Sequence, residues 1–269
     1  MSASGSLMFR QSGAIRSLTD AVSDILAVAE RNLLTYLRVP QLLVFSTIQP
    51  VIFVLLFRYV FGGAVQVPGG NYVNFLMPGI FVQTTVFGAI GTAVGLATDL
   101  QSGLLERFRS LPMSRTAVMA GRTAAELVRN VFVVALMVGV GFAVGFRPNT
   151  DVGSFAVAMA LVLLFGYVFS WIFAGVGLAT GDPESAQAAA FPVLALLVFA
   201  SSAFVPVSTM PGWLQVYAEH QPVSVTIEAV RSLLLGGSAL PDVLKTLAWM
   251  GGILAVFAPL SVWRYQRTT

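Results

Sequence analysis

Long apolar segments, separated by shorter polar ones, recur along the whole chain. Each is close to the roughly 20 residues that a helix needs to cross about 30 Å of hydrocarbon. The six segments cover residues 42–61, 75–98, 127–146, 155–180, 188–205 and 243–263. Because every backbone polar group must be paired inside lipid, continuous apolar runs of this length favour helices over a barrel. The pattern therefore predicts an all-α integral membrane protein with six transmembrane helices.

The segment before the first apolar run has helical periodicity. Between residues 17 and 38, apolar side chains recur at helical spacing on one face and charged side chains occupy the other. Ser17 followed by Asp20 makes a plausible capping box, and Pro40 disfavours helical backbone at the residue before it. We therefore expect an amphipathic interfacial helix over residues 17–38. Since the first apolar run begins only at Leu42, we expect no cleavable signal peptide.

Composition and charge support this interpretation. Of the 269 residues, 57% are hydrophobic and 10% are charged, whereas about a quarter of an average soluble domain is charged. Eleven of the fifteen Lys and Arg residues fall on one side if the N-terminus is cytoplasmic. The positive-inside rule then places both termini in the cytoplasm. We expect the chain in the inner (plasma) membrane of a bacterial cell. The absence of cysteine excludes disulfides, thiolate metal sites and a cysteine nucleophile.

Two connections are longer than turns, an inner one over residues 99–126 and an outer one over residues 206–242. No other domain is indicated, so residues 1–269 are expected to form one membrane domain. The inner loop contains a short amphipathic rod that ends at Pro112, with Glu106, Arg107 and Arg109 on its charged edge. Such a rod suits docking to a soluble partner. From physics alone, the alternative is equally good: the arginines would only fix topology and bind anionic lipid.

A few uncharged polar residues lie deep in the first two apolar segments: Gln49, Gln83, Thr84 and Thr85. They could line a pathway or form hydrogen bonds between helices, and the sequence favours neither. The scarcity of strong charges in the spans argues against an ion pump with buried carboxylates and suits a lipophilic or amphiphilic cargo.

Glycines spaced four apart predict close helix packing. The pairs are Gly91 and Gly95, Gly141 and Gly145, and Gly177 and Gly181.

The outer loop predicts two short helices with apolar faces. The first contains Trp213, Leu214 and Tyr217, and the second covers residues 225–235 and ends at two glycines. Trp and Tyr favour the membrane interface. His220 is the only histidine and has no nucleophile or ligand cluster around it, so we expect neither a catalytic residue nor a metal site in this chain.

Two loop signatures resemble those of permease subunits of ABC-2 type exporters, in particular the daunorubicin-resistance group. The inner one is residues 100–122, with Gln-Ser-Gly, Glu-Arg-Phe-Arg-Ser-Leu-Pro and Ser-Arg; the outer one includes Met-Pro-Gly-Trp-Leu and His-Gln-Pro-Val-Ser. The resemblance implies that Glu106, Arg107, Phe108 and Arg109 form a coupling helix in a groove of an ATPase. It also implies that residues 17–38 form a connector helix. Residues 211–235, with Trp213, Leu214 and Tyr217, would be re-entrant or interfacial helices at an outer gate.

An exporter needs an energy source, and this chain has no Gly-rich phosphate loop, since its only lysine is Lys245. ATP and Mg are therefore expected on a separate ABC ATPase, in two copies, beneath two permease chains, which are identical or homologous. The expected ligands are membrane lipid and a hydrophobic drug, antibiotic or lipid-like substrate, with no nucleic acid and no cofactor in this chain. The alternative is a polytopic membrane enzyme or a structural membrane subunit, which the scattered acidic residues and lone histidine disfavour.

Overall fold

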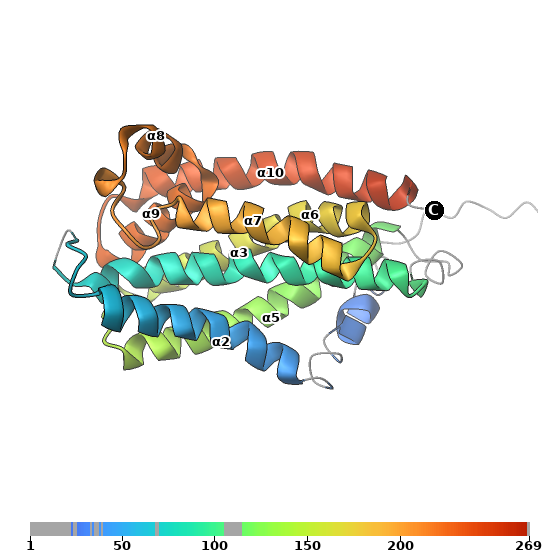
Figure 1. Cartoon of the computed structure of the whole chain (residues 1–269), viewed down its shortest axis with the longest axis horizontal. Helices are drawn as coiled ribbons and strands as arrows, with labels where there is room; N and C mark the ends of the chain where they lie inside the picture. Colours follow the sequence, from blue (N-terminus) through green and yellow to red (C-terminus); the bar gives the residue numbers. More distant parts are fainter. Residues whose placement is uncertain are drawn as a thin grey trace, which may run out of the picture.

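The computed structural model describes residues 23, 26–32, 34, 38, 40–67, 70–104 and 115–267. Within these ranges the chain is helical and contains no strand. Long helices run side by side in an elongated bundle, with two short helices across one end and the C-terminus at the other (Figure 1). The prediction of an all-α protein is confirmed.

In the described part of the chain, six apolar helical segments build the bundle. They are α2 (Pro40–Leu56), which continues into the π-helical turn η1 (Phe57–Phe61), α3 (Tyr72–Gln101), α5 (Arg115–Ala143), α6 (Val152–Thr180), α7 (Pro183–Phe199) and α10 (Ala239–Arg267). The 3₁₀ turn η2 (Val207–Thr209) and the short helices α8 (Gly212–His220) and α9 (Pro222–Leu235) lie between α7 and α10. The two predicted outer helices are therefore present. The described residues before Pro40 are also helical, within the range predicted for the interfacial helix.

Among the described residues, four helical segments are long and apolar enough to cross a membrane: Tyr72–Gln101, Ala120–Ala143, Val152–Thr180 and Ala239–Arg267. Two shorter apolar helices, Ser46–Phe61 and Pro183–Phe199, coincide with the other two predicted spans. The membrane assignment is confirmed, whereas six crossings remain a prediction. The predicted span 188–205 is too long as a helix, because α7 ends at Phe199 and the chain then turns.

The inner connection is shorter than predicted. Helix α3 ends at Gln101 and α5 begins at Arg115, so helix extends into both ends of the predicted loop 99–126. The four residues expected to contact an ATPase, Glu106, Arg107, Phe108 and Arg109, lie outside the described residues.

Aspartates cap the N-termini of α6 and α7, the two helices that follow short turns. Asp151 accepts a hydrogen bond from the Ser154 backbone N–H at the start of α6, and Asp182 does the same with Ser185 at the start of α7. Hydrogen bonds from the Ser154 and Ser185 side chains hold the pKa of each carboxyl below its usual value. Both turns therefore end in a stable N-cap.

Helix α3 lies at the centre and contacts α2, α5, α6, α7 and α9. Its contact with α6 is close enough that a Cβ on Gly177 would lie 2.2 Å from the carbonyl oxygen of Ala93. Packing was therefore the correct prediction for Gly177. It was wrong for Gly145 and Gly181, which have φ values of +97° and +78° and follow the ends of α5 and α6.

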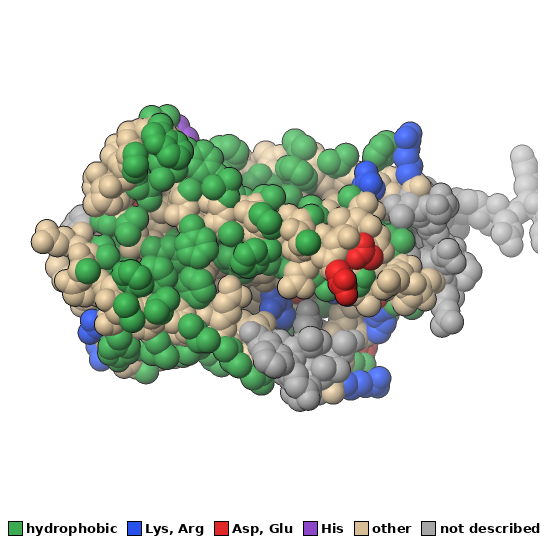
Figure 2. Space-filling model, viewed as in Figure 1, with side chains coloured by type: hydrophobic (Ala, Val, Ile, Leu, Met, Phe, Trp, Pro, Cys, Tyr) green, Lys and Arg blue, Asp and Glu red, His purple; other side chains and the backbone are tan. Residues whose placement is uncertain are grey.

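The surface of the bundle is largely apolar. Hydrophobic side chains gather over α2, α3 and α7 on the face shown in Figure 2. Large exposed residues include Ile52, Tyr59, Phe191, Leu196 and Trp249. A soluble protein rarely exposes so much contiguous apolar surface, so these helices face lipid or other membrane helices.

Candidate functional site

A polar seam runs between α3 and α5. Helix α3 contributes Thr84, Gly88, Gly91, Gly95 and Asp99, each three or four residues from the next, so all five lie on one helical face. Helix α5 contributes side chains with the same spacing: Arg122, Glu126 and Arg129. At about 1.5 Å per residue, the seam extends roughly 22 Å along α3. It links the C-terminal end of α3 to the interior of the bundle.

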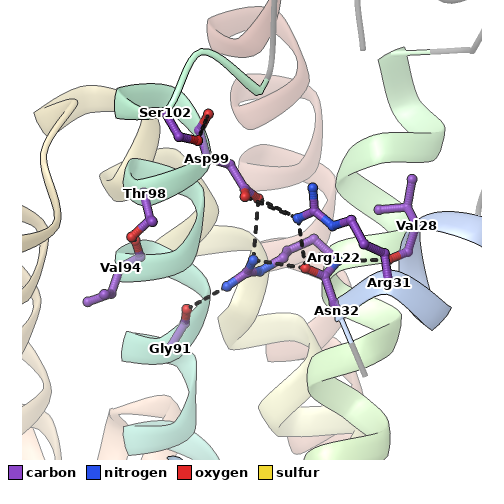
Figure 3. A network of polar contacts seen from close by, with 9 residues as sticks. All are labelled: Val28, Arg31, Asn32, Gly91, Val94, Thr98, Asp99, Ser102 and Arg122. Carbon is purple, nitrogen blue, oxygen red and sulfur yellow. Dashed lines mark hydrogen bonds and ion pairs between the residues drawn. The ribbon is translucent and has the colours of Figure 1, made fainter. Parts of the chain in front are cut away.

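At the inner end of the seam, four residues form what we call the inner network (Figure 3). Asp99 accepts hydrogen bonds from Arg31 Nη2 at 3.0 and 3.2 Å and from Arg122 Nη1 at 3.3 Å. Asn32 Oδ1 accepts from Arg31 at 3.0 Å and from Arg122 at 3.1 Å. The network therefore joins the helical segment before α2 to α3 and α5, the two helices on either side of residues 105–114.

Deeper in the seam, Glu126 and Arg129 form a buried ion pair. These residues are only 1% and 9% exposed, and Arg129 Nη2 also donates to Asn130 Oδ1 at 3.1 Å. Glycines on α3 make the room: a Cβ on Gly88 would lie 2.4 Å from Arg129 Nη2, and one on Gly95 only 1.3 Å from Arg122 Nη2. The glycines of α3 along the seam thus accommodate long polar side chains of α5, whereas the close contact with α6 uses Gly177 of α6.

Next to Arg129 lies a small polar cavity of about 70 Å³. Its lining comprises Ser46, Gln49, Pro50, Gln83, Thr84, Phe87, Gly88 and Arg129. The structure therefore brings together three of the four residues predicted to line a pathway or bond between helices. Thr85 is separate from them: its hydroxyl donates to the Val82 carbonyl, and its side chain faces Gly166 of α6.

A larger cavity of about 830 Å³ lies between the start of α3 and helices α8 and α9. On its wall Arg231 donates to the carbonyls of Phe75 and Ser202 at 3.1 and 2.8 Å, pairs with Glu228, and stacks 3.8 Å from the centre of the Phe75 ring. Arg231 therefore holds α9 against α3 and the turn after α7.

The predicted gate residues lie on α8. Trp213 is 76% exposed, Tyr217 is also exposed, and Leu214 is half-buried. The His220 ring lies 2.8 Å from the Val216 carbonyl, at the end of the same helix. Among the residues that the structure describes, no three His, Asp or Glu side chains converge to hold a metal.

The buried charges correct the expectation that the spans lack strong charges. We had expected Asp99 and Glu126 in the cytoplasmic loop and Arg129 beside it, whereas all three lie in helices, and Glu126 and Arg129 fall within the candidate span Ala120–Ala143. The sequence carried a signal for them, since Arg122, Glu126 and Arg129 recur at helical spacing opposite three glycines of α3 with the same spacing.

Comparisons with known proteins agree with this architecture. The chain is 35% identical over 246 residues to the daunorubicin resistance ABC transporter permease protein DrrB1 of Streptomyces coeruleorubidus, an alignment that covers 91% of this chain and 87% of the relative. It is 27% identical over 203 residues to the doxorubicin resistance ABC transporter permease protein DrrB of Mycobacterium tuberculosis, covering 73% and 70% of the two chains. Residues 23–235 match the family model described as ABC-2 type transporter, and the chain therefore belongs to the ABC-2 type transporter family.

Proposed function

We propose that this chain is the membrane permease of an ATP-driven exporter in the bacterial inner membrane. Two permease chains, identical or homologous, would assemble with two copies of an ABC ATPase that carries ATP and Mg. Each permease would cross the membrane six times and keep both termini in the cytoplasm. The main support is membership of a transporter family, together with relatives whose names assign them to drug-resistance permeases.

Coupling to the ATPase would use residues 105–114, with Glu106, Arg107, Phe108 and Arg109 in contact with the ATPase. The inner network supports this proposal, because Asp99 and Arg122 tie together the two helices that flank this segment. A displacement of residues 105–114 would therefore act on both helices at once. The polar seam then gives a continuous contact along which α3 and α5 can shift relative to each other.

The cargo would be a hydrophobic or amphiphilic molecule, such as a drug, an antibiotic or a lipid. The apolar faces of α2 and α7 beside the polar cavity support this class of substrate. At the outer end, α8 and α9 would form the gate, with the exposed Trp213 and Tyr217 and the half-buried Leu214 in the outer leaflet. Arg231 would hold the gate on α3.

The test is purification of the tagged permease in mild detergent, followed by identification of the proteins that accompany it. An ABC ATPase should co-purify, and daunorubicin should stimulate its ATP hydrolysis in the complex. Glu106→Gln and Arg109→Gln should weaken both properties. Arg147→Gln serves as a matched control, because Arg147 donates to the carbonyls of Phe142 in the last turn of α5 and of Phe146 just after it, at the opposite end of that helix.

Two results would contradict the proposal. If co-purification and stimulation are unchanged in both inner variants, the coupling role of Glu106 and Arg109 is wrong. If stable complexes form without any ATPase, the exporter mechanism fails, and the alternative of a membrane enzyme or structural subunit gains support.

A further inference from the structure

One side chain in the wall of the polar cavity has an unmet hydrogen-bonding demand. Gln83 is only 2% exposed, and its Oε1 accepts no hydrogen bond from any residue that the structure describes. A buried amide oxygen without a donor is unfavourable, so such groups are normally satisfied by protein, water or ligand. Whatever occupies the cavity should therefore bring a hydrogen-bond donor.

The charge of the cavity restricts that donor. Arg129 contributes a guanidinium to the lining, whereas its partner Glu126 lies outside the lining and faces Gly91. The described residues of the lining include no carboxylate, so an ammonium group would lose its hydration in the cavity without gaining a counter-charge. A carboxylate or fully ionised phosphate has no hydrogen to donate to Gln83. A neutral hydroxyl satisfies both conditions, and it can also accept a hydrogen bond.

The mouth of the cavity suggests what the hydroxyl is attached to. Gln49 is exposed, and Ser46 and Phe87 are partly exposed, so the cavity meets the surface between α2 and α3. The Phe87 ring lies 6.0 Å from that of Phe191 on α7, which is 49% exposed. A polar recess of about 70 Å³ thus adjoins an aromatic surface. The recess admits one small polar group, or about two waters, and nothing larger.

We propose that this cavity recognises the hydroxyl group of an amphiphilic cargo, with Gln83 accepting its hydrogen and Phe87 and Phe191 contacting its apolar body. The interpretation of the ligand as cargo rests on the proposed function. The binding itself does not, because it is a property of this chain alone. Gln83 would then be the specificity-determining residue of the site.

The experiment compares 2-naphthol with 2-methoxynaphthalene, which keeps the aromatic body and the oxygen but lacks the donated hydrogen. Binding of each probe to the full chain in nanodiscs is measured by equilibrium dialysis, with empty nanodiscs as the baseline for partition into lipid. One hydrogen bond to a buried acceptor should favour the naphthol by roughly fivefold. Gln83→Leu should reduce this preference to about one. Thr84→Val should leave it largely unchanged, because the Thr84 hydroxyl donates to the Ile80 carbonyl and the single hydrogen of the probe goes to Gln83.

Thr92→Val is the matched control. Thr92 lies on the same helix, is fully buried, has a hydroxyl without a partner in the described structure, and does not line the cavity. Its replacement should leave the preference unchanged, and monodisperse elution of all three variants checks that they fold.

Equal binding of the two probes to the wild type, or an unchanged preference in Gln83→Leu, would overturn the proposal and leave a water-filled cavity only. Selective binding without ATP-driven transport would instead contradict the proposed function and leave the site intact.

Discussion

Replacing Asp99 with asparagine tests whether the inner network holds three segments of the bundle together. The change keeps the shape of the side chain and one carbonyl oxygen but removes the charge. Arg31 and Arg122 both donate to Asp99 Oδ2, so an amide oxygen in that position could still accept from both, but the hydrogen bonds would lose the negative charge of the acceptor. The N-terminal segment, α3 and α5 should separate more easily, with no apolar contact altered.

The size of the effect follows from exposure. The Arg31 side chain is 34% exposed, so its pair with Asp99 is screened and contributes only about 0.5 kcal/mol. Asp99 and Arg122 are each 14% exposed, and a charged hydrogen bond in such surroundings contributes roughly 1.5–3 kcal/mol. Since asparagine preserves part of this, we expect a loss of about 2 kcal/mol in the free energy of unfolding, or a fall of roughly 4–8 °C in Tm.

Thermal unfolding of the purified protein in detergent measures this shift. Asp182→Asn is the matched control: Asp182 caps α7, and asparagine caps a helix about as well as aspartate, so Tm should change by no more than about 1 °C. A double-mutant cycle with Arg122→Gln separates the pair from the rest of the site. The reasoning is refuted if Asp99→Asn has the same Tm as the wild type, or if the effects of Asp99→Asn and Arg122→Gln on the free energy of unfolding simply add.

Two glycine substitutions test the packing of α3 in the same melting assay, and Gly139→Ala is their common control. A Cβ on Gly139 would meet nothing within 4 Å, so this change should stabilise the helix by up to about 1 kcal/mol. Gly95→Ala must displace the guanidinium of Arg122 and should cost about 1–2 kcal/mol despite its better helix propensity; stability equal to that of the control would contradict the position of Arg122. Gly177→Ala meets the Ala93 backbone, which cannot rotate away, so we expect a loss of about 1–3 kcal/mol, and an increase in Tm would show that α3 and α6 are not in close contact.

The long helices were predictable from the length of the apolar segments. In lipid, the backbone groups of such a segment must pair with one another, and a helix achieves this within the segment itself. The short outer helices were also predictable, since α8 and α9 have apolar faces and α9 ends at Gly236, whose φ is +89°. The burial of Arg231 against Phe75 could not be predicted from the sequence, because this contact joins residues 156 positions apart.

The polar seam was missed because the sequence was divided into spans and loops by charge. Under that criterion Glu126 and Arg129 mark the edge of the membrane, whereas in the fold they are buried beside Gly88 and Gly91. A charged residue considered alone indicates a loop or the edge of the membrane. When two helices carry complementary small and charged residues at the same spacing, the charges can be paired inside the bundle instead.

The buried pair is hard to explain as a source of stability. A charged residue at the centre of a membrane helix costs roughly 2.5–3.5 kcal/mol on insertion scales, and replacing a buried ion pair with apolar residues is often neutral or stabilising. The contact of α3 with α6, by comparison, relies on Gly177 against the Ala93 backbone, which allows no rearrangement. Along the seam between α3 and α5, long side chains meet glycines instead of backbone, and they can exchange hydrogen-bond partners without forming a cavity. Among the neighbours of α3, α6 is therefore rigid and α5 adjustable, and α5 begins at the end of the segment proposed to meet the ATPase.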